Sequence, residues 1–152
     1  MSSALVTIEN LNKSYGRGPV LQSLNLTVNS GRIVGVMGPN GCGKTTLFKI
    51  LTGLISDYQG TVTIDGQAPG VYTKSIVSYL PEKTYLSDWM RAKDALDMFR
   101  DFYADFDRQK AAEMLQRFRL DEKMKLKSMS KGMQEKLQLI LVMSRAAKLY
   151  IL

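Results

Sequence analysis

The stretch Gly38-Pro39-Asn40-Gly41-Cys42-Gly43-Lys44-Thr45 decides the fold of this chain, because it fits the pattern G-x-x-x-x-G-K-[ST] at every fixed position. Glycines let consecutive backbone N–H groups turn inward and form a concave anion site. Lys44 supplies a positive charge for the β- and γ-phosphates of a nucleotide, and the Thr45 hydroxyl is a candidate ligand for Mg²⁺. The pattern predicts a phosphate-binding loop, with an ordinary glycine-rich turn as the alternative.

The flanks of the loop favour phosphate binding. Residues 33–37 form a continuous apolar run directly after Arg32. This run predicts that residues 32–37 form a strand that is buried on both faces. Residues 45–52 read as a helix that ends at Gly53. A strand before the loop and a helix after it are the setting in which this motif binds phosphate. We interpret Cys42 as a small residue at a variable loop position, rather than as a redox switch.

Alternating apolar and polar residues and turn signals predict further strands in the first half of the chain. They lie at residues 5–8, 24–28, 60–64 and 76–80, with a turn-rich stretch at 15–19.

Helical periodicity replaces this pattern after Pro81. The first predicted helix carries an apolar face at steps of three and four residues: Trp89, Ala92, Leu96, Phe99 and Tyr103. Asp107 and Ser130 are expected to cap two further helices. Residues 149–152 then begin another strand. We therefore expect one domain, with a β-rich core at 1–82, a helical part at 83–146 and a strand beginning at 147–152.

Composition is that of a globular protein. The 152 residues are 45% hydrophobic, with one cysteine and no histidine. These counts exclude an internal disulfide and a multi-cysteine metal site. No run approaches the length that spans a bilayer, and the N-terminus lacks the features of a secretion signal. We expect a cytoplasmic protein.

The net charge of +7 is concentrated near the C-terminus, because residues 108–152 hold 11 basic and 4 acidic side chains, a difference of +7. A nucleic-acid surface is one interpretation. We favour a solvated helical surface, because no RNA-binding motif or interleaved aromatic residues accompany the charge.

The sequence GPNGCGKTTL at residues 38–47 resembles the Walker A motif of ATP-binding cassette ATPases. The resemblance implies an α/β fold: a P-loop NTPase core, whose mixed β-sheet has antiparallel strands at its N-terminal side, plus a helical subdomain, with the C-terminal part of the core absent. It implies ATP and Mg²⁺ as cofactors and Tyr15 as the aromatic residue that stacks on adenine, with a plain turn tyrosine as the alternative. The nucleotide-binding residues it implies are Tyr15, Gly38, Pro39, Asn40, Gly41, Cys42, Gly43, Lys44, Thr45, Thr46, Ser130 and Gly132.

Two later segments resemble family motifs with departures. Tyr79-Leu80-Pro81-Glu82 is similar to the Q-loop, where most members have Gln and this chain has Glu82. Glu82 is accordingly a weak candidate for catalysis and for a Mg²⁺ ligand beside Thr45. Met129-Ser130-Lys131-Gly132-Met133 resembles the signature LSGGQ, matching at Ser130 and Gly132. The resemblance implies that Ser130 acts on the γ-phosphate held by a second subunit, while Lys44 acts within its own chain.

Residues 149–152 resemble the apolar part of a Walker B strand, and the acidic pair that completes this motif in the family would follow Leu152. We therefore expect ATP binding with poor hydrolysis or none. The resemblance implies an ATPase subunit that pairs with a second ATP-binding subunit and a separate transmembrane permease, peripheral at the inner face of the cell membrane. No nucleic-acid partner is expected. The alternatives are a soluble ATPase of this type acting on ribosomes or DNA, and a non-hydrolysing nucleotide-binding fragment.

Overall fold

The computed structural model describes residues 3–152 of the chain. It contains two compact units, the first ending at Val77 and the second running from Ser78 to Leu152. Within residues 3–152, no helix is both long and apolar enough to cross a membrane.

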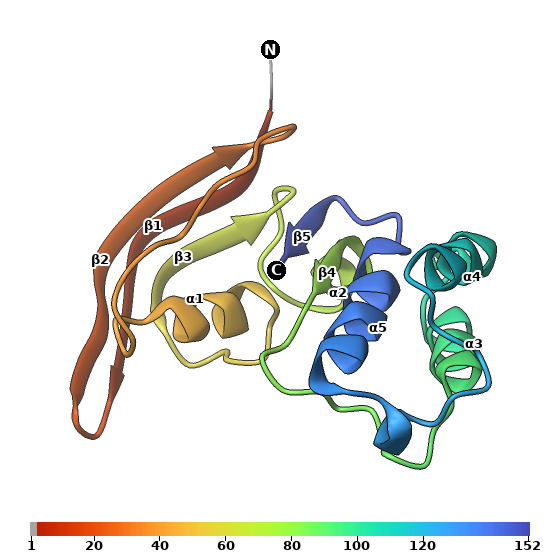
Figure 1. Cartoon of the computed structure of the whole chain (residues 1–152). Coiled ribbons are helices and arrows are strands. Elements are labelled where there is room, and N and C mark those ends of the chain that lie inside the picture. Colours follow the sequence, from red (N-terminus) through yellow and green to blue (C-terminus); the bar gives the residue numbers. More distant parts are fainter. Residues whose placement is uncertain (1–2) are drawn as a thin grey trace. The chain divides into compact units, whose positions relative to one another are not determined.

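The first unit is built on an antiparallel sheet whose strands lie in the order β2-β1-β3. The strands are β1 (Ala4–Tyr15), β2 (Gly18–Asn29) and β3 (Gln59–Ile64) (Figure 1). The turn-rich stretch predicted at 15–19 connects β1 to β2, and Tyr15 pairs with Gly18 where the two strands meet. Shifts in the β1–β2 register interrupt the regular pairing between Ile8 and Ser14.

Burial in this sheet follows the predicted alternation. On β2, residues 24–28 alternate between half-buried apolar and exposed polar side chains. On β1, Val6, Ile8 and Leu11 are buried together with apolar side chains of β3. The sheet therefore buries one set of side chains and exposes the other, as a half-covered antiparallel sheet does.

The first unit also contains two helices. The predicted helix after the glycine-rich loop is α1 (Lys44–Leu51), which buries Leu47, Ile50 and Leu51. It ends before Gly53, whose φ of +74° suits glycine at a helix C-terminus. The second helix, α2 (Val71–Ile76), was not expected from the sequence. Its first turn is held locally, because the Gly70 N–H donates to Thr73 Oγ1 at 2.7 Å.

The prediction of a buried strand at residues 32–37 is wrong for the described chain. These residues form neither helix nor strand, and the side chains of Ile33 and Met37 are almost entirely exposed. A strand exists only where its backbone N–H and C=O groups pair with a neighbouring strand. Within residues 3–152, no strand pairs with this run, so its apolar composition does not suffice to make it one.

The second unit is mainly helical. Its elements are β4 (Val77–Tyr79, which begins at the last residue of the first unit), α3 (Ala92–Phe102), α4 (Arg108–Arg117), the 3₁₀ helix η1 (Leu126–Ser128), α5 (Lys131–Met143) and β5 (Leu149–Ile151) (Figure 1). The faces of α3, α4 and α5 share one hydrophobic cluster. Leu96, Leu115 and Leu137 are among its completely buried members. The last strand, β5, pairs with β4 in a two-stranded sheet.

Both predicted helix caps in this unit are confirmed. Asp107 Oδ1 accepts a hydrogen bond from the Lys110 N–H at 2.9 Å at the start of α4. Ser130 Oγ accepts one from the Met133 N–H at 3.2 Å at the start of α5. Each side chain satisfies an N–H group that the first turn of a helix leaves without a partner.

The predicted start of the first helix is wrong. Trp89 was expected on its apolar face, but α3 begins at Ala92 and the Trp89 side chain is 70% exposed. The Arg91 N–H donates to Asp94 Oδ2 at 2.9 Å and fixes the start of α3 there. In the segment that leads into α3, Met90 is buried and Trp89 is not.

A partly buried ion pair joins distant parts of the second unit. Arg145, only 4% exposed, donates to both carboxylate oxygens of Asp105 at 3.0 and 3.2 Å. Its guanidinium also lies over the Tyr103 ring, 3.9 Å from the centroid. These contacts fasten the connector between α3 and α4 to the segment that follows α5.

Candidate functional site: the glycine-rich loop

The loop at residues 38–45 owes its shape to its glycines. Gly41 and Gly43 have φ values of +82° and +104°, a region that L side chains rarely adopt. A side chain at position 38 would collide with Cys42, because its Cβ would lie 2.6 Å from Cys42 Sγ. The Cys42 N–H donates to the Pro39 carbonyl at 3.3 Å and closes a turn. The loop therefore bends tightly before α1 begins.

The ammonium group of Lys44 lies against the backbone of this bend. Nζ donates to the carbonyl of Gly38 and, at 3.1 Å, to the carbonyl of Pro39. It also lies 3.8 Å from Cys42 Sγ. The positive charge of Lys44 is thus held over the same backbone segment that the motif predicts for phosphate.

The N-terminus of α1 completes an anion-binding arrangement. Gly43 is the N-cap residue, no side chain caps the helix, and the first turn contains no acidic residue. The first N–H groups and the positive end of the helix dipole therefore face the loop without a competing carboxylate. Thr45 and Thr46 lie half-buried in this first turn. Glycines at positive φ, a lysine ammonium and an open helix N-terminus are the donor set that a nucleotide phosphate requires.

The hairpin of β1 and β2 supports the loop, a contribution that sequence reasoning did not identify. Gly43 is buried against β2, and a Cβ there would lie 2.9 Å from Leu21 Cδ2 and 3.0 Å from the Val20 carbonyl. The close approach requires glycine at position 43 for packing as well as for its φ. Val20 and Leu21 lie between the predicted turn at 15–19 and the predicted strand at 24–28, and their contact with the loop depends on a strand register that composition does not specify.

Tyr15, the predicted adenine-stacking residue, lies at the end of the same hairpin in the same unit as the loop. It is the last residue of β1, and its side chain is 46% exposed. A half-exposed ring of this kind can stack on a base. The stacking itself stays a prediction.

The remaining predicted residues belong to the second unit. Glu82 is exposed in the segment after β4, and Ser130 and Gly132 are exposed at the start of α5. Burial raises the pKa of the Tyr79 hydroxyl, and the negative charge of Glu82 raises it further. Roles for these three residues at a nucleotide stay predictions, because each lies in a unit separate from the loop.

Lys131 departs from the family signature but does not disturb the cap at Ser130. It forms an exposed i,i+4 ion pair with Glu135 at 3.9 Å. A side chain at Gly132 would meet no atom within 4 Å. Exposed pairs of this kind contribute little to stability.

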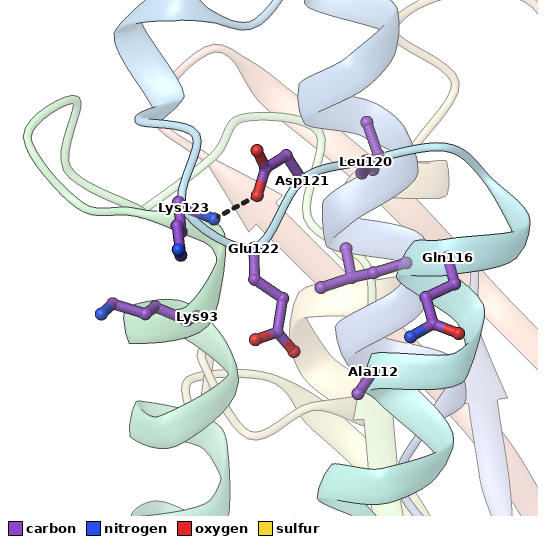
Figure 2. Close-up of a pocket in the computed structure, with 8 residues that line it drawn as sticks. Lys93, Ala112, Gln116, Leu120, Asp121, Glu122 and Lys123 are labelled. Carbon is purple, nitrogen blue, oxygen red and sulfur yellow. Dashed lines mark hydrogen bonds between the residues drawn. The ribbon is translucent and has the colours of Figure 1, made fainter.

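A pocket of about 550 Å³ lies in the second unit, between α3, α4 and residues 120–123. Figure 2 shows Lys93 and Lys123 on one side of it and Gln116 on the other, with Glu122 between them. The lining contains no residue that the motifs predict to bind nucleotide. Its charged side chains are mixed in sign, two lysines and two carboxylates, so they do not favour a phosphate. Within residues 3–152, no group of three or more Cys, Asp or Glu residues is arranged to hold a metal ion.

Comparison with known sequences agrees with the motifs. The family model described as ABC transporter matches residues 21–152. The ATP-binding protein LptB of the lipopolysaccharide export system of Haemophilus influenzae is 34% identical over 126 residues, covering 77% of this chain and 52% of the relative. The ABC transporter ATP-binding protein YtrB of Bacillus subtilis is 30% identical over 152 residues, covering 97% of this chain and 51% of the relative. The chain thus spans about half the length of these relatives.

Comparison with solved structures gives the fold. The ATP-binding subunit of an ABC transporter matches with a TM-score of 0.85 at 26% identity, covering 96% of this chain and 64% of that chain. The predicted fold class, a P-loop NTPase core with antiparallel strands and a helical part, is confirmed. The chain contains part of that fold.

Proposed function

Because the chain belongs to the ABC transporter family, we propose that it is the nucleotide-binding part of a transporter ATPase subunit. Binding of ATP in the loop at residues 38–45 would be coupled to substrate movement through a separate membrane subunit. The observation that carries the proposal is the arrangement of Lys44, the two glycines at positive φ and the open N-terminus of α1.

Each residue of the loop has a proposed task. The N–H groups of residues 41–46 would surround the phosphates, and Lys44 would exchange its contacts with the loop carbonyls for the β- and γ-phosphate oxygens. The Thr45 hydroxyl would contribute one ligand to Mg²⁺, which neutralises phosphate charge when bound. Tyr15 would stack on the adenine.

The second unit would act across a dimer. Ser130 and Gly132 lie at the N-terminus of α5, which favours an anion and has no acidic residue in its first turn. We assign them to the γ-phosphate held by a second ATP-binding subunit. Glu82 is assigned to the Mg²⁺ shell as a weak ligand. Exposed Tyr85 and Trp89 are proposed as part of the surface that meets the membrane subunit.

We further propose that these 152 residues bind ATP with little or no turnover. Lys44 and Thr45 serve binding. Phosphoryl transfer also depends on the positioning of Mg²⁺ and the attacking water, and Glu82, the acidic residue assigned to the Mg²⁺ shell, is only a weak candidate for that task.

The test is a titration of a fluorescent ATP analogue in the presence of Mg²⁺. Lys44→Ala should weaken binding by about 10- to 150-fold, since it removes charge-assisted hydrogen bonds worth roughly 1.5–3 kcal/mol. Lys49→Ala, which removes an exposed lysine from the last turn of the same helix, is the matched control and should bind as the parent does. Equal affinity of the Lys44→Ala variant and the parent would refute the loop assignment. Steady phosphate release that requires Lys44 would refute the binding-only proposal.

A further inference from the structure

Lys13 is a buried cation two residues before Tyr15 on β1. Its side chain is only 7% exposed, which is rare for lysine because an ammonium group loses its hydration on burial. Such a group must therefore find partners within the protein. The structure gives Lys13 two of them.

The first partner is Asp57, in the connector between α1 and β3. Lys13 Nζ donates to Asp57 Oδ2 at 3.0 Å, and the Asp57 side chain is itself exposed. The second partner is the ring of Tyr15, whose centroid lies 4.9 Å from Nζ. A cation at this distance over a ring is attracted to its negative π face. The ammonium thus connects a carboxylate on one side to an aromatic ring on the other.

Lys13 is also placed beside the phosphate loop by the register of the hairpin. It pairs across the strands with Leu21, the residue whose side chain meets Gly43. The register shifts on both sides of Lys13, and such irregularities redirect side chains. Tyr15 and the start of α1 are therefore held by the same short part of the hairpin.

We propose that Lys13 is a positioning residue for the nucleotide base: its ammonium, oriented by Asp57, holds the Tyr15 ring in place to receive the purine. This inference rests on the proposed function and names a determinant of base binding within it. A ring at the end of a hairpin loses rotamer freedom when a base stacks on it, and a ring already held by Lys13 has less freedom to lose. The exposed part of Tyr15 is the surface left for the base.

A purely structural role for Lys13 makes a different prediction. If the ion pair only fastened the connector to β1, its loss would loosen the loop and affect every ligand that contacts phosphate-binding groups. A positioning role concerns the base alone. Ligands with and without a base therefore separate the two roles.

The experiment measures the binding of ATP and of inorganic tripolyphosphate by isothermal titration calorimetry. Lys13→Met keeps the length of the side chain and removes its charge. It should weaken ATP binding by roughly three- to tenfold and leave tripolyphosphate binding unchanged. Lys49→Met is the matched control, and both ligands should bind it as they bind the parent. In a Tyr15→Ala background, Lys13→Met should have no further effect on ATP, because the ring that it positions is gone.

Asp57→Asn is the second variant and covers the case in which Lys13→Met does not fold, because Asp57 lies on the surface. It should lower ATP affinity in the same direction and spare tripolyphosphate. Equal losses for both ligands, or no loss for ATP, would overturn the positioning role. Failure of the parent to bind either ligand would instead contradict the proposed function.

Discussion

The helical unit buries the apolar faces of α3, α4 and α5 in one cluster, whereas the first unit leaves Ile33 and Met37 exposed although they lie in an uninterrupted apolar run. The difference arises from the backbone. A helix pairs its N–H and C=O groups within its own segment, so three amphipathic helices can assemble wherever their faces meet. A strand needs a neighbour for every such group. Hydrophobic sequence alone therefore predicts a helix face better than it predicts a central strand.

The largest expected effect contrasts one apolar truncation in each unit. Leu137→Ala removes a completely buried side chain from the helical cluster and should lower the free energy of unfolding of that unit by about 2–5 kcal/mol. Ile33→Ala removes a fully exposed side chain and should change stability by less than about 0.5 kcal/mol. Hydrogen exchange with mass spectrometry, read separately for the two units, measures both. A cost at Ile33 comparable to that at Leu137 would show that residues 32–37 are packed in solution.

The second prediction applies the same substitution, glycine to alanine, to both units. Gly43→Ala should destabilise the first unit by about 1–3 kcal/mol, because its φ is +104° and its Cβ would meet Leu21 and Val20. Gly132→Ala should be neutral or stabilise the second unit by up to about 1 kcal/mol, since the position is helical and open. Urea unfolding, followed by circular dichroism, measures whether each substitution lowers or raises the free energy of unfolding. Tolerance of alanine at position 43 would contradict the packing of the loop on the hairpin.

The smallest effect concerns helix ends. Asp107→Ala removes the side chain that accepts from the Lys110 N–H and should cost the helical unit about 0.5–2 kcal/mol. Asp107→Asn should recover most of that loss, because asparagine caps helices about as well as aspartate. Thermal unfolding of the two variants distinguishes the cap from any effect of charge. Equal melting temperatures for the parent and Asp107→Ala would show that tertiary packing alone fixes the start of α4.

Local signals predicted most of the fold. The caps at Asp107 and Ser130, the helix after the glycine-rich loop and the turn at 15–19 all depend on residues close in sequence, and the structure confirms them. The strand at 32–37 depended on a distant partner and was wrong. The helix α2 is six residues long and carries little periodicity, so no pattern predicted it.

The candidate site was predictable to the same extent. The motif gave the position of the loop and the identity of Lys44. The support from Val20 and Leu21, and the contact between Lys13 and Tyr15, arise from a hairpin register that includes irregularities. Regular alternation of apolar and polar residues along a strand predicts neither of these contacts. Sequence therefore located the loop, and the structure was needed to show what holds it.

The ion pair between Arg145 and Asp105 has a consequence for how the helical unit is made in the cell. The two residues are 40 positions apart, so the ribosome adds Arg145 roughly 2–8 s after Asp105 at about 5–20 residues per second. Until α5 (Lys131–Met143) has been made, the apolar faces of α3 and α4 have no third helix to cover them. Newly made chains should therefore be most open to chaperones and to aggregation after α4 has been made and before α5 is complete.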